Sequence, residues 1–410
     1  MTRQSNIFVY GGLRKAWDRI SSKKLSTIFT AVVGERAGNA CYSHYEVFGS
    51  LLGMTLGGGS CLEDLQYLRR THKDALPMRI CSPDTAAYAL KELAVEDHLV
   101  LSERSCHLFN RNNKLNRLLI STAKNLGMIK KVIDLDVDGK VFECGKKDAK
   151  GTYTGTVGYQ PMMAFSGRIP LYIEGRNGNT NASFCMHLML RDCFTKLREE
   201  NIQVDRLRID AAGCQYKVIK EVKNNCRSFF IRCSDVLHHL QGQELHWEKV
   251  TIGQREIEVA QGQWKHPGYK KPFRLVVERN QDIREQTNIF TGESYIYRGI
   301  ITNHTAMTPQ QVIQYYNGRG AAERNFDFLG NDFNLNHLPF SSMKMNMVYM
   351  AAMAWCAIVF EYLKTTLRKR FGKNVIKWRL KQFIYRYVIH PFRLTKHARK
   401  ITVQFAPGYT

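Results

Sequence analysis

The sequence lacks the features that mark exported or disulfide-stabilised proteins. Its 11 cysteines are odd in number and scattered, and no two of them form a C-x-x-C pair. This spacing predicts neither a disulfide framework nor a zinc knuckle, and it favours a reducing compartment. Residues 1–20 carry charged side chains where a signal peptide needs an unbroken apolar stretch. We therefore expect a cytoplasmic protein.

Long apolar runs are also missing. The longest, residues 347–360, ends at Glu361, whereas a helix that crosses a bilayer needs about 20 apolar residues. We expect a buried core helix at this position and no membrane partner.

Acidic residues are scarce. The chain has 36 Asp and Glu against 60 Lys and Arg, a formal charge of +24, and no acid from residue 364 to its end. Such an excess favours a polyanionic partner, either nucleic acid or an anionic membrane face. A hydrophobic content of 44% argues against general disorder, and 410 residues predict two or three domains.

Hydrophobic periodicity divides the chain. Apolar residues recur with helical spacing up to residue 128. From residue 131 they alternate, which predicts a strand, a turn at Asp138-Gly139 and a second strand at 141–142. Further strands then alternate with helices, a pattern typical of a mixed α/β sheet with helices on its faces.

The later part of the chain changes pattern twice. Strand-like segments without helices between about 235 and 300 predict a separate β insertion, and helical spacing returns from Pro309. The expected divisions are a helical N-terminal region, the first part of an α/β core, the β insertion, the second part of the core and a basic C-terminal region, at residues 1–128, 129–234, 235–300, 301–365 and 366–410.

Three aspartates share one face of the strand near residue 135. Asp134, Asp136 and Asp138 concentrate negative charge there, an arrangement that calls for a cation. An EF-hand calcium loop is one alternative, but its bidentate acid would fall on Gly145, and the flanking segments are strands. A solvated hairpin face is the other.

Two more acids occupy suggestive positions. Asp210 follows an apolar strand, at the end where open α/β sheets expose functional groups; a helix cap or turn is the alternative. Helical spacing places Tyr316, Arg319 and Glu323 on one face, where Arg319 and Glu323 could instead form a surface ion pair.

Taken together, these acids resemble those of the DDE transposases of bacterial insertion sequences, most closely the group numbered thirteen-eighty. The resemblance covers about residues 130–365. It is carried by five ordered segments: Asp134-Leu135-Asp136, Gly158-Tyr159-Gln160-Pro161 with Met163-Ala164-Phe165, Arg208-Ile209-Asp210, Ile301-Thr302-Asn303, and Tyr316 through Glu323. Two positions depart from the family pattern: Asp138 stands where threonine is frequent, and Gly330 stands where the helix signature has lysine, for which Lys344 could substitute.

The resemblance implies a ribonuclease H-like mixed sheet as the catalytic core. It implies that Asp136, Asp210 and Glu323 are catalytic and hold Mg²⁺, for which Mn²⁺ can substitute; Asp134 is the alternative to Asp136. Carboxylates suit this role because Mg²⁺ prefers oxygen ligands, and divalent metals support phosphodiester cleavage.

By the same resemblance, the protein binds the terminal inverted repeats of its element, hydrolyses the ends and joins the 3′-hydroxyl to target DNA. It would act as a homodimer associated with the bacterial nucleoid. Tyr316 and Arg319 would contact the DNA backbone, Trp264 would hold a base at a cleaved end, and the N-terminal region would read the repeats or mediate dimerisation. The alternatives are an inactive or domesticated transposase that only binds DNA, and another ribonuclease H-like nuclease.

Overall fold

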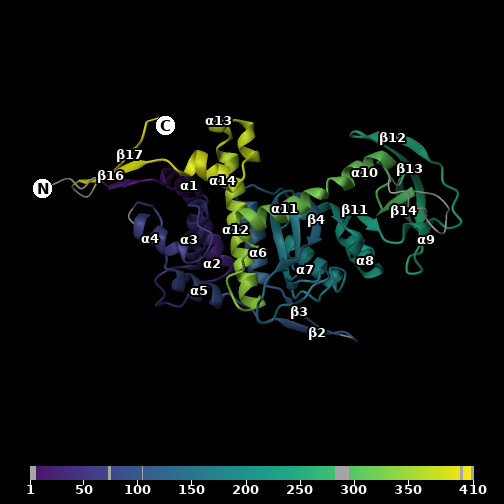
Figure 1. The fold of residues 1–410 in the computed structure, drawn as a ribbon, viewed down its shortest axis with the longest axis horizontal. Helices are drawn as coiled ribbons and strands as arrows, with labels where there is room; N and C mark the ends of the chain where they lie inside the picture. The colour runs from purple at the N-terminus through teal and green to yellow at the C-terminus, as the bar shows by residue number, and fades with distance from the viewer. Residues whose placement is uncertain (1–5, 73–74, 104, 282–294, 398–399, 408–410) are drawn as a thin grey trace.

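The computed structural model describes residues 6–72, 75–103, 105–281, 295–397 and 400–407 (Figure 1). The N-terminal region is helical, as predicted, because its apolar residues fall on single helix faces. Its helices are α1 (Gly11–Ser21), α2 (Leu25–Val32), α3 (His44–Leu56), α4 (Asp64–His72) and α5 (Pro83–Glu92). The strands β2 (His98–Leu101) and β3 (Cys106–Asn110) then lead to α6 (Asn113–Asn125).

One large mixed sheet organises the molecule, and it confirms the predicted mixed α/β class. In the described residues it has 11 strands in the order β12-β13-β14-β15-β11-β10-β4-β8-β9-β3-β2. Its central strands are β4 (Val132–Gly139), β8 (Met162–Ser166), β9 (Ile169–Arg176), β10 (Gln203–Ile209) and β11 (Cys226–Cys233). β10 runs parallel to both β4 and β11, so these three strands end at the same edge.

The predicted hairpin at Asp138-Gly139 is wrong. β4 continues through Gly139 and pairs antiparallel with β8, while β5 (Phe142–Glu143) joins β6 (Lys150–Gly151) and β7 (Val157–Tyr159) in a small separate sheet. Gly139 serves close packing and not a turn, because an added Cβ would lie 2.6 Å from the Met162 sulfur.

The predicted β insertion is not separate from the core. β12 (Glu248–Ile252), β13 (Arg255–Trp264), β14 (Phe273–Gln281) and β15 (Tyr295–Thr302) extend the large sheet, since β15 pairs antiparallel with β11. The segment also contains a short helix, α9 (Val236–Leu240). Helix α10 (Pro309–Asn317) packs over β13 and β14, and α11 (Gly320–Asp332) reaches β4 (Figure 1).

Helices α7 (Met186–Glu199) and α8 (Tyr216–Asn225) connect the central strands. Helix α12 (Met343–Thr366) confirms the predicted core helix. By length and composition it is the one described helix that could cross a membrane, but 89% of its most apolar window is buried inside the protein. It packs against α3, α6 and β9 and so joins the N-terminal helices to the sheet.

The two ends of the chain form one unit. After α12 come α13 (Arg368–Phe371), the 3₁₀-helix η2 (Lys373–Lys377), α14 (Leu380–Phe383) and the π-helix η3 (Ile384–Val388). The strands β16 (Phe392–His397) and β17 (Lys400–Phe405) follow and pair antiparallel. β16 pairs with β1 (Asn6–Phe8). The expected separation of residues 366–410 from residues 1–128 therefore does not occur.

Candidate active site

The three aspartates of β4 share one face, as predicted, but each has a different environment. Asp134 is exposed and accepts a hydrogen bond from the Tyr315 hydroxyl at 2.9 Å. Asp136 is only 3% exposed. Asp138, also buried, lies at the end of the strand, and it is the aspartate that the sheet brings beside Asp210.

Strand register explains this pairing. β4 and β10 run parallel with Arg208 opposite Asp136 and Ile209 opposite Val137, so the next residues, Asp138 and Asp210, end neighbouring strands side by side. Burial, together with the nearby Asp210 carboxylate, raises the pKa of Asp138 to about 6, and Arg319 opposes this rise. Burial also raises the pKa of Asp210. Two carboxylates thus share a partly buried site in which charge is poorly solvated.

Arg319 and Tyr316 close the site from the turn between α10 and α11. Arg319 Nη1 donates to Asp138 Oδ2 at 2.8 Å. The Tyr316 hydroxyl donates to the carbonyl oxygen of Ile209 at 3.3 Å, immediately before Asp210. Arg319 lies close enough to Asp210 to oppose the rise in its pKa. The site therefore combines two acids with the fixed cation Arg319, and Arg232 also lies near enough to Asp210 to oppose the rise in its pKa.

Asp136 belongs to an ion pair that the sequence analysis missed. Arg208 donates from Nε to Oδ1 at 2.5 Å and from Nη2 to Oδ2 at 2.8 Å, and its Nη1 donates to the Tyr315 carbonyl at 2.7 Å. A bidentate guanidinium occupies both carboxylate oxygens, so in this structure Asp136 holds Arg208 and the end of α10. The alternation of β4 predicts its acidic face but not the arginine opposite.

Glu323 lies on a different helix from Tyr316. The chain makes a turn at Gly318 and Arg319, whose amides donate to the carbonyls of Tyr315 and Tyr316, and α11 starts afterwards. The expected single helix face is therefore interrupted, because Gly318 and Gly320, on either side of Arg319, favour a break. Glu323 is exposed in the first turn of α11. Across the described ranges, no three His, Cys, Asp or Glu side chains gather as a metal site.

Trp264 is buried, in contrast to its expected role. Its side chain is 3% exposed and stacks on His266 with ring centroids 5.5 Å apart, and Phe273 lies beside it. His266 in turn stacks on Tyr216 of α8 at 5.1 Å. This stack fastens the extended sheet to α8, and a base cannot reach the indole in this arrangement.

Neither position considered for the lysine of the helix signature places a lysine at the site. Gly330 packs closely against Asn336, whose amide oxygen would lie 2.7 Å from an added Cβ. Lys344, the expected substitute, donates to both carboxylate oxygens of Glu96 at 2.8 and 3.1 Å.

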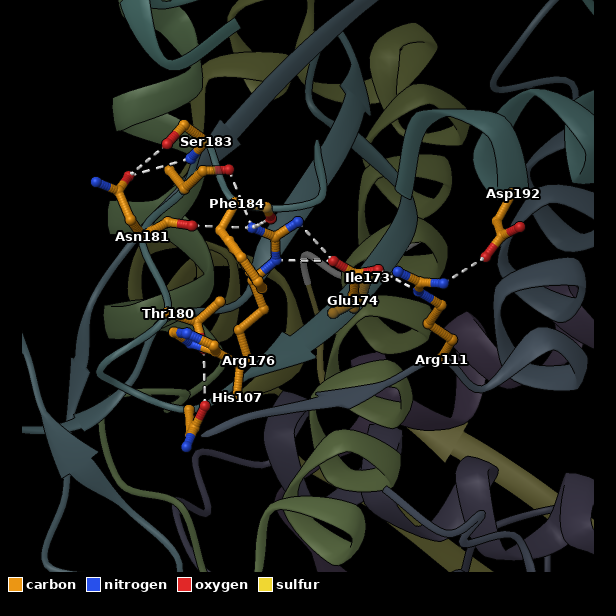
Figure 2. Close-up of polar contacts among 12 residues, drawn as sticks. His107, Arg111, Ile173, Glu174, Arg176, Thr180, Asn181, Ser183, Phe184 and Asp192 are labelled. Atoms are coloured by element: carbon orange, nitrogen blue, oxygen red, sulfur yellow. Dashed lines mark hydrogen bonds and ion pairs between the residues drawn. The ribbon is translucent and has the colours of Figure 1, made fainter. Parts of the chain in front are cut away.

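A buried ionic network holds the loop of residues 181–184 (Figure 2). Glu174 and Arg176 are fully buried on β9 and form an ion pair at 2.7 Å, and Arg111 bridges Glu174 to Asp192. Arg176 Nη1 donates to the carbonyls of residues 181, 182 and 184 at 2.9 to 3.2 Å. Figure 2 shows this guanidinium facing the loop. In the sequence, this network could have been recognised from Glu174 and Arg176, two charged residues inside an otherwise apolar strand.

The chain is similar to known proteins. Residues 92–410 match the family described as transposase DDE domain group 1. A comparison with curated proteins finds no match. Among solved structures, the chain is similar to a piggyBac transposase in a synaptic complex with hairpin DNA, determined by cryo-electron microscopy. The TM-score is 0.40 at 11% identity, over 93% of this chain and 84% of that one.

Proposed function

Because this chain belongs to the transposase DDE domain group 1 family, we propose that it cleaves and rejoins DNA at the ends of its own insertion sequence. It binds the terminal inverted repeats, hydrolyses a phosphodiester bond at each end and joins the freed 3′-hydroxyl to target DNA. It works as a homodimer, since two ends must be brought together, and it acts at the bacterial nucleoid.

The observation that carries this proposal is the placement of Asp138 and Asp210. They end two adjacent parallel strands, and burial raises the pKa of both. We assign the first catalytic acid to Asp138 and not to Asp136, because Asp138 lies beside Asp210, whereas Asp136 is held in a bidentate ion pair by Arg208. Glu323, at the start of α11, is the third acid.

The donor set fits a divalent cation. Carboxylate oxygens are the ligands that Mg²⁺ prefers, and two poorly solvated carboxylates are stabilised by a cation between them. Asp138, Asp210 and Glu323 would hold Mg²⁺, or Mn²⁺ in its place. When bound, the metal supplies charge neutralisation at the phosphate and activation of the attacking oxygen.

The other residues of the site position the substrate. Arg319, a fixed guanidinium between the acids and solvent, contacts a phosphate of the bound DNA. Tyr316 holds the α10 end against β10 through its bond to the Ile209 carbonyl. Its role is to position Arg319, since its side chain is only 8% exposed.

The basic C-terminal region supplies affinity for the DNA backbone. It has no acidic residue from 364 onwards, and its cations neutralise phosphates. Trp378, Phe383 and Tyr387 are buried there, so packing explains these aromatics; Tyr385 is 77% exposed and is free to stack on a base.

The test is cleavage of a DNA fragment that carries the gene and its flanks, incubated with purified protein and Mg²⁺ or Mn²⁺. We expect breaks at inverted repeats that bound the gene. They should be absent with Asp210→Ala, Asp138→Asn and Glu323→Gln, which should all still bind DNA in a mobility-shift assay. Binding without breaks under either metal would instead favour an inactive, DNA-binding relative, and loss of binding in all three variants would refute the assigned roles.

A further inference from the structure

Two thiols meet beside the segment that carries Asp210. Cys214 ends the turn η1 (Ala211–Gly213), and Cys233 is the last residue of β11. The turn packs against β11. The Cys233 thiol donates to the Ser234 carbonyl at 3.0 Å. The Cys214 sulfur lies within hydrogen-bonding reach of the Cys233 and Ser234 side chains.

Cys214 differs chemically from the buried cysteines. Hydrogen bonding with Cys233 lowers the pKa of Cys214 and raises that of Cys233, and burial raises the pKa of Cys193, Cys226 and Cys356. Thiolates, not thiols, are the nucleophiles in oxidation and disulfide exchange. Cys214 is therefore the best prepared of these cysteines to react.

A small oxidant can reach the pair. Cys214 is half-buried. Cys233 is only 4% exposed, but it lines an open cavity of about 1060 Å³ together with Arg232, Val236 and Tyr297. A peroxide or a low-molecular-weight disulfide is small enough to enter this space.

We propose that Cys214 and Cys233 form a reversible disulfide under oxidising conditions, and that this modification switches off strand cleavage. The second half rests on the proposed function. With hydrogen peroxide, the Cys214 sulfur attacks one oxygen and the other leaves as water, which gives a sulfenic acid. Cys233 then loses its proton and attacks that sulfur, the S–S bond forms, and the sulfenic hydroxyl leaves with a proton as a second water. Two thiols are oxidised and one peroxide is reduced.

The expected loss of activity follows from the turn. Asp210 caps η1: its Oδ1 accepts from Ala212 N at 3.1 Å, and its carbonyl accepts from Gly213 N at 3.1 Å. A disulfide of about 2.05 Å is shorter than a hydrogen-bonded sulfur contact, so its formation pulls the turn toward β11 and moves Asp210 relative to Asp138. A displacement of about 1 Å in a catalytic group costs about a hundredfold in rate.

The experiment treats the full-length protein with hydrogen peroxide, removes the excess with catalase, blocks free thiols and maps tryptic peptides. We expect a cross-link between peptides 209–217 and 233–249. Cleavage of the gene-bearing DNA should fall about a hundredfold and return with dithiothreitol. Cys214→Ser and Cys233→Ser should retain cleavage after peroxide, while Cys106→Ser, at an exposed cysteine, should respond like the wild type.

The two hypotheses fail in distinguishable ways. Absence of the cross-link, when peroxide has oxidised the exposed cysteines, overturns the disulfide. A cross-link with unchanged cleavage, or equal inactivation of both serine variants, overturns the switch. If the reduced protein cleaves no DNA, the proposed function fails. The peptide map then still shows whether the disulfide forms. The change in Mn²⁺ affinity on oxidation, measured by calorimetry, shows whether the disulfide alters the acidic site.

Discussion

At the scale of single residues, two aspartates two positions apart on β4 have different surroundings. Asp136 is neutralised by a bidentate arginine, while Asp138 lies beside Asp210 and accepts one hydrogen bond from Arg319 and one from the Gly139 amide. A buried charge that loses its partner is costly, whereas a carboxylate kept beside another carboxylate is typical of a functional site.

This contrast predicts different outcomes for the same substitution. Asp136→Asn leaves Arg208 without its charged partner, and we expect it to destabilise the fold by about 3–5 kcal/mol. Asp138→Asn should reduce cleavage at least about a hundredfold, because even outer-shell partners of metals contribute 10–100-fold, with little loss of stability. Urea unfolding and the cleavage assay check both. Equal stability with lost cleavage in Asp136→Asn would return the catalytic role to that residue.

The sequence pointed to an acidic strand face but not to the aspartate that lies beside Asp210. Alternation places Asp134, Asp136 and Asp138 together, but the choice depends on the register with β10, which is a long-range property of the sheet. Asp210 was accessible to sequence reasoning because it directly follows an apolar strand. Arg208 was not, since its partner is 72 residues away along the chain.

Gly318 offers a second test at this scale. An added Cβ would lie 2.4 Å from Arg208 Nη1, in a backbone conformation that alanine otherwise accepts. Gly318→Ala should therefore push Arg208 off Asp136 and destabilise the protein by about 1–3 kcal/mol. Gly320→Ala is the matched control, because an added Cβ there meets nothing within 4 Å. Similar unfolding curves for the two variants would contradict the close packing.

At the scale of elements, the first residue of helix α3 makes the stability of the fold sensitive to acid. His44, its first residue, is 5% exposed, its Nδ1 has no hydrogen-bond partner, and burial lowers its pKa to about 4 despite nearby Glu92. A positive charge at a helix N-terminus is also unfavourable. The folded protein therefore keeps this histidine neutral.

The direction of the pH effect follows from this lowered pKa. An unfolded histidine takes up a proton near pH 6.5, whereas folded His44 does so only near pH 4. Keeping His44 neutral costs no folding stability above pH 6.5. As the pH falls toward 4, the unfolded chain takes up this proton and the folded protein does not, so the free energy of unfolding falls, by about 2 kcal/mol at pH 5. His44→Gln should remove this part of the difference between urea midpoints at pH 7.5 and pH 5. Exposed His337→Gln should leave it unchanged.

The strands of residues 235–300 show what periodicity misses. Alternation located β13, β14 and β15, but it could not show that β15 pairs with β11 and so continues the core sheet. Pairing partners depend on contacts distant in sequence, and the sequence of one strand does not show which strand lies beside it. The broken helix at Gly318 was missed for a local reason, because helical spacing continued across it.

At the scale of the whole molecule, α12 joins the N-terminal helices to the sheet. Trp355 at its middle is fully buried, meets Phe29 and Phe48 edge to face at 5.5 and 5.8 Å, and donates to Thr122 at 3.2 Å. Trp355→Ala should cost about 3–5 kcal/mol and lower the thermal midpoint of the entire protein. Tyr385→Ala, at an exposed aromatic, should not. Separate transitions, with only one shifted, would show that the two parts unfold independently.

The pairing of β1 with β16 has a consequence for synthesis. β1 is hydrogen-bonded to β16, with Asn6 opposite Leu394 and Phe8 opposite Phe392, and the two strands lie on the same side of the molecule (Figure 1). During synthesis β1 therefore has no strand partner until Phe392 has left the exit tunnel. A fragment that terminates before β16 keeps the edge of β1 open to proteases.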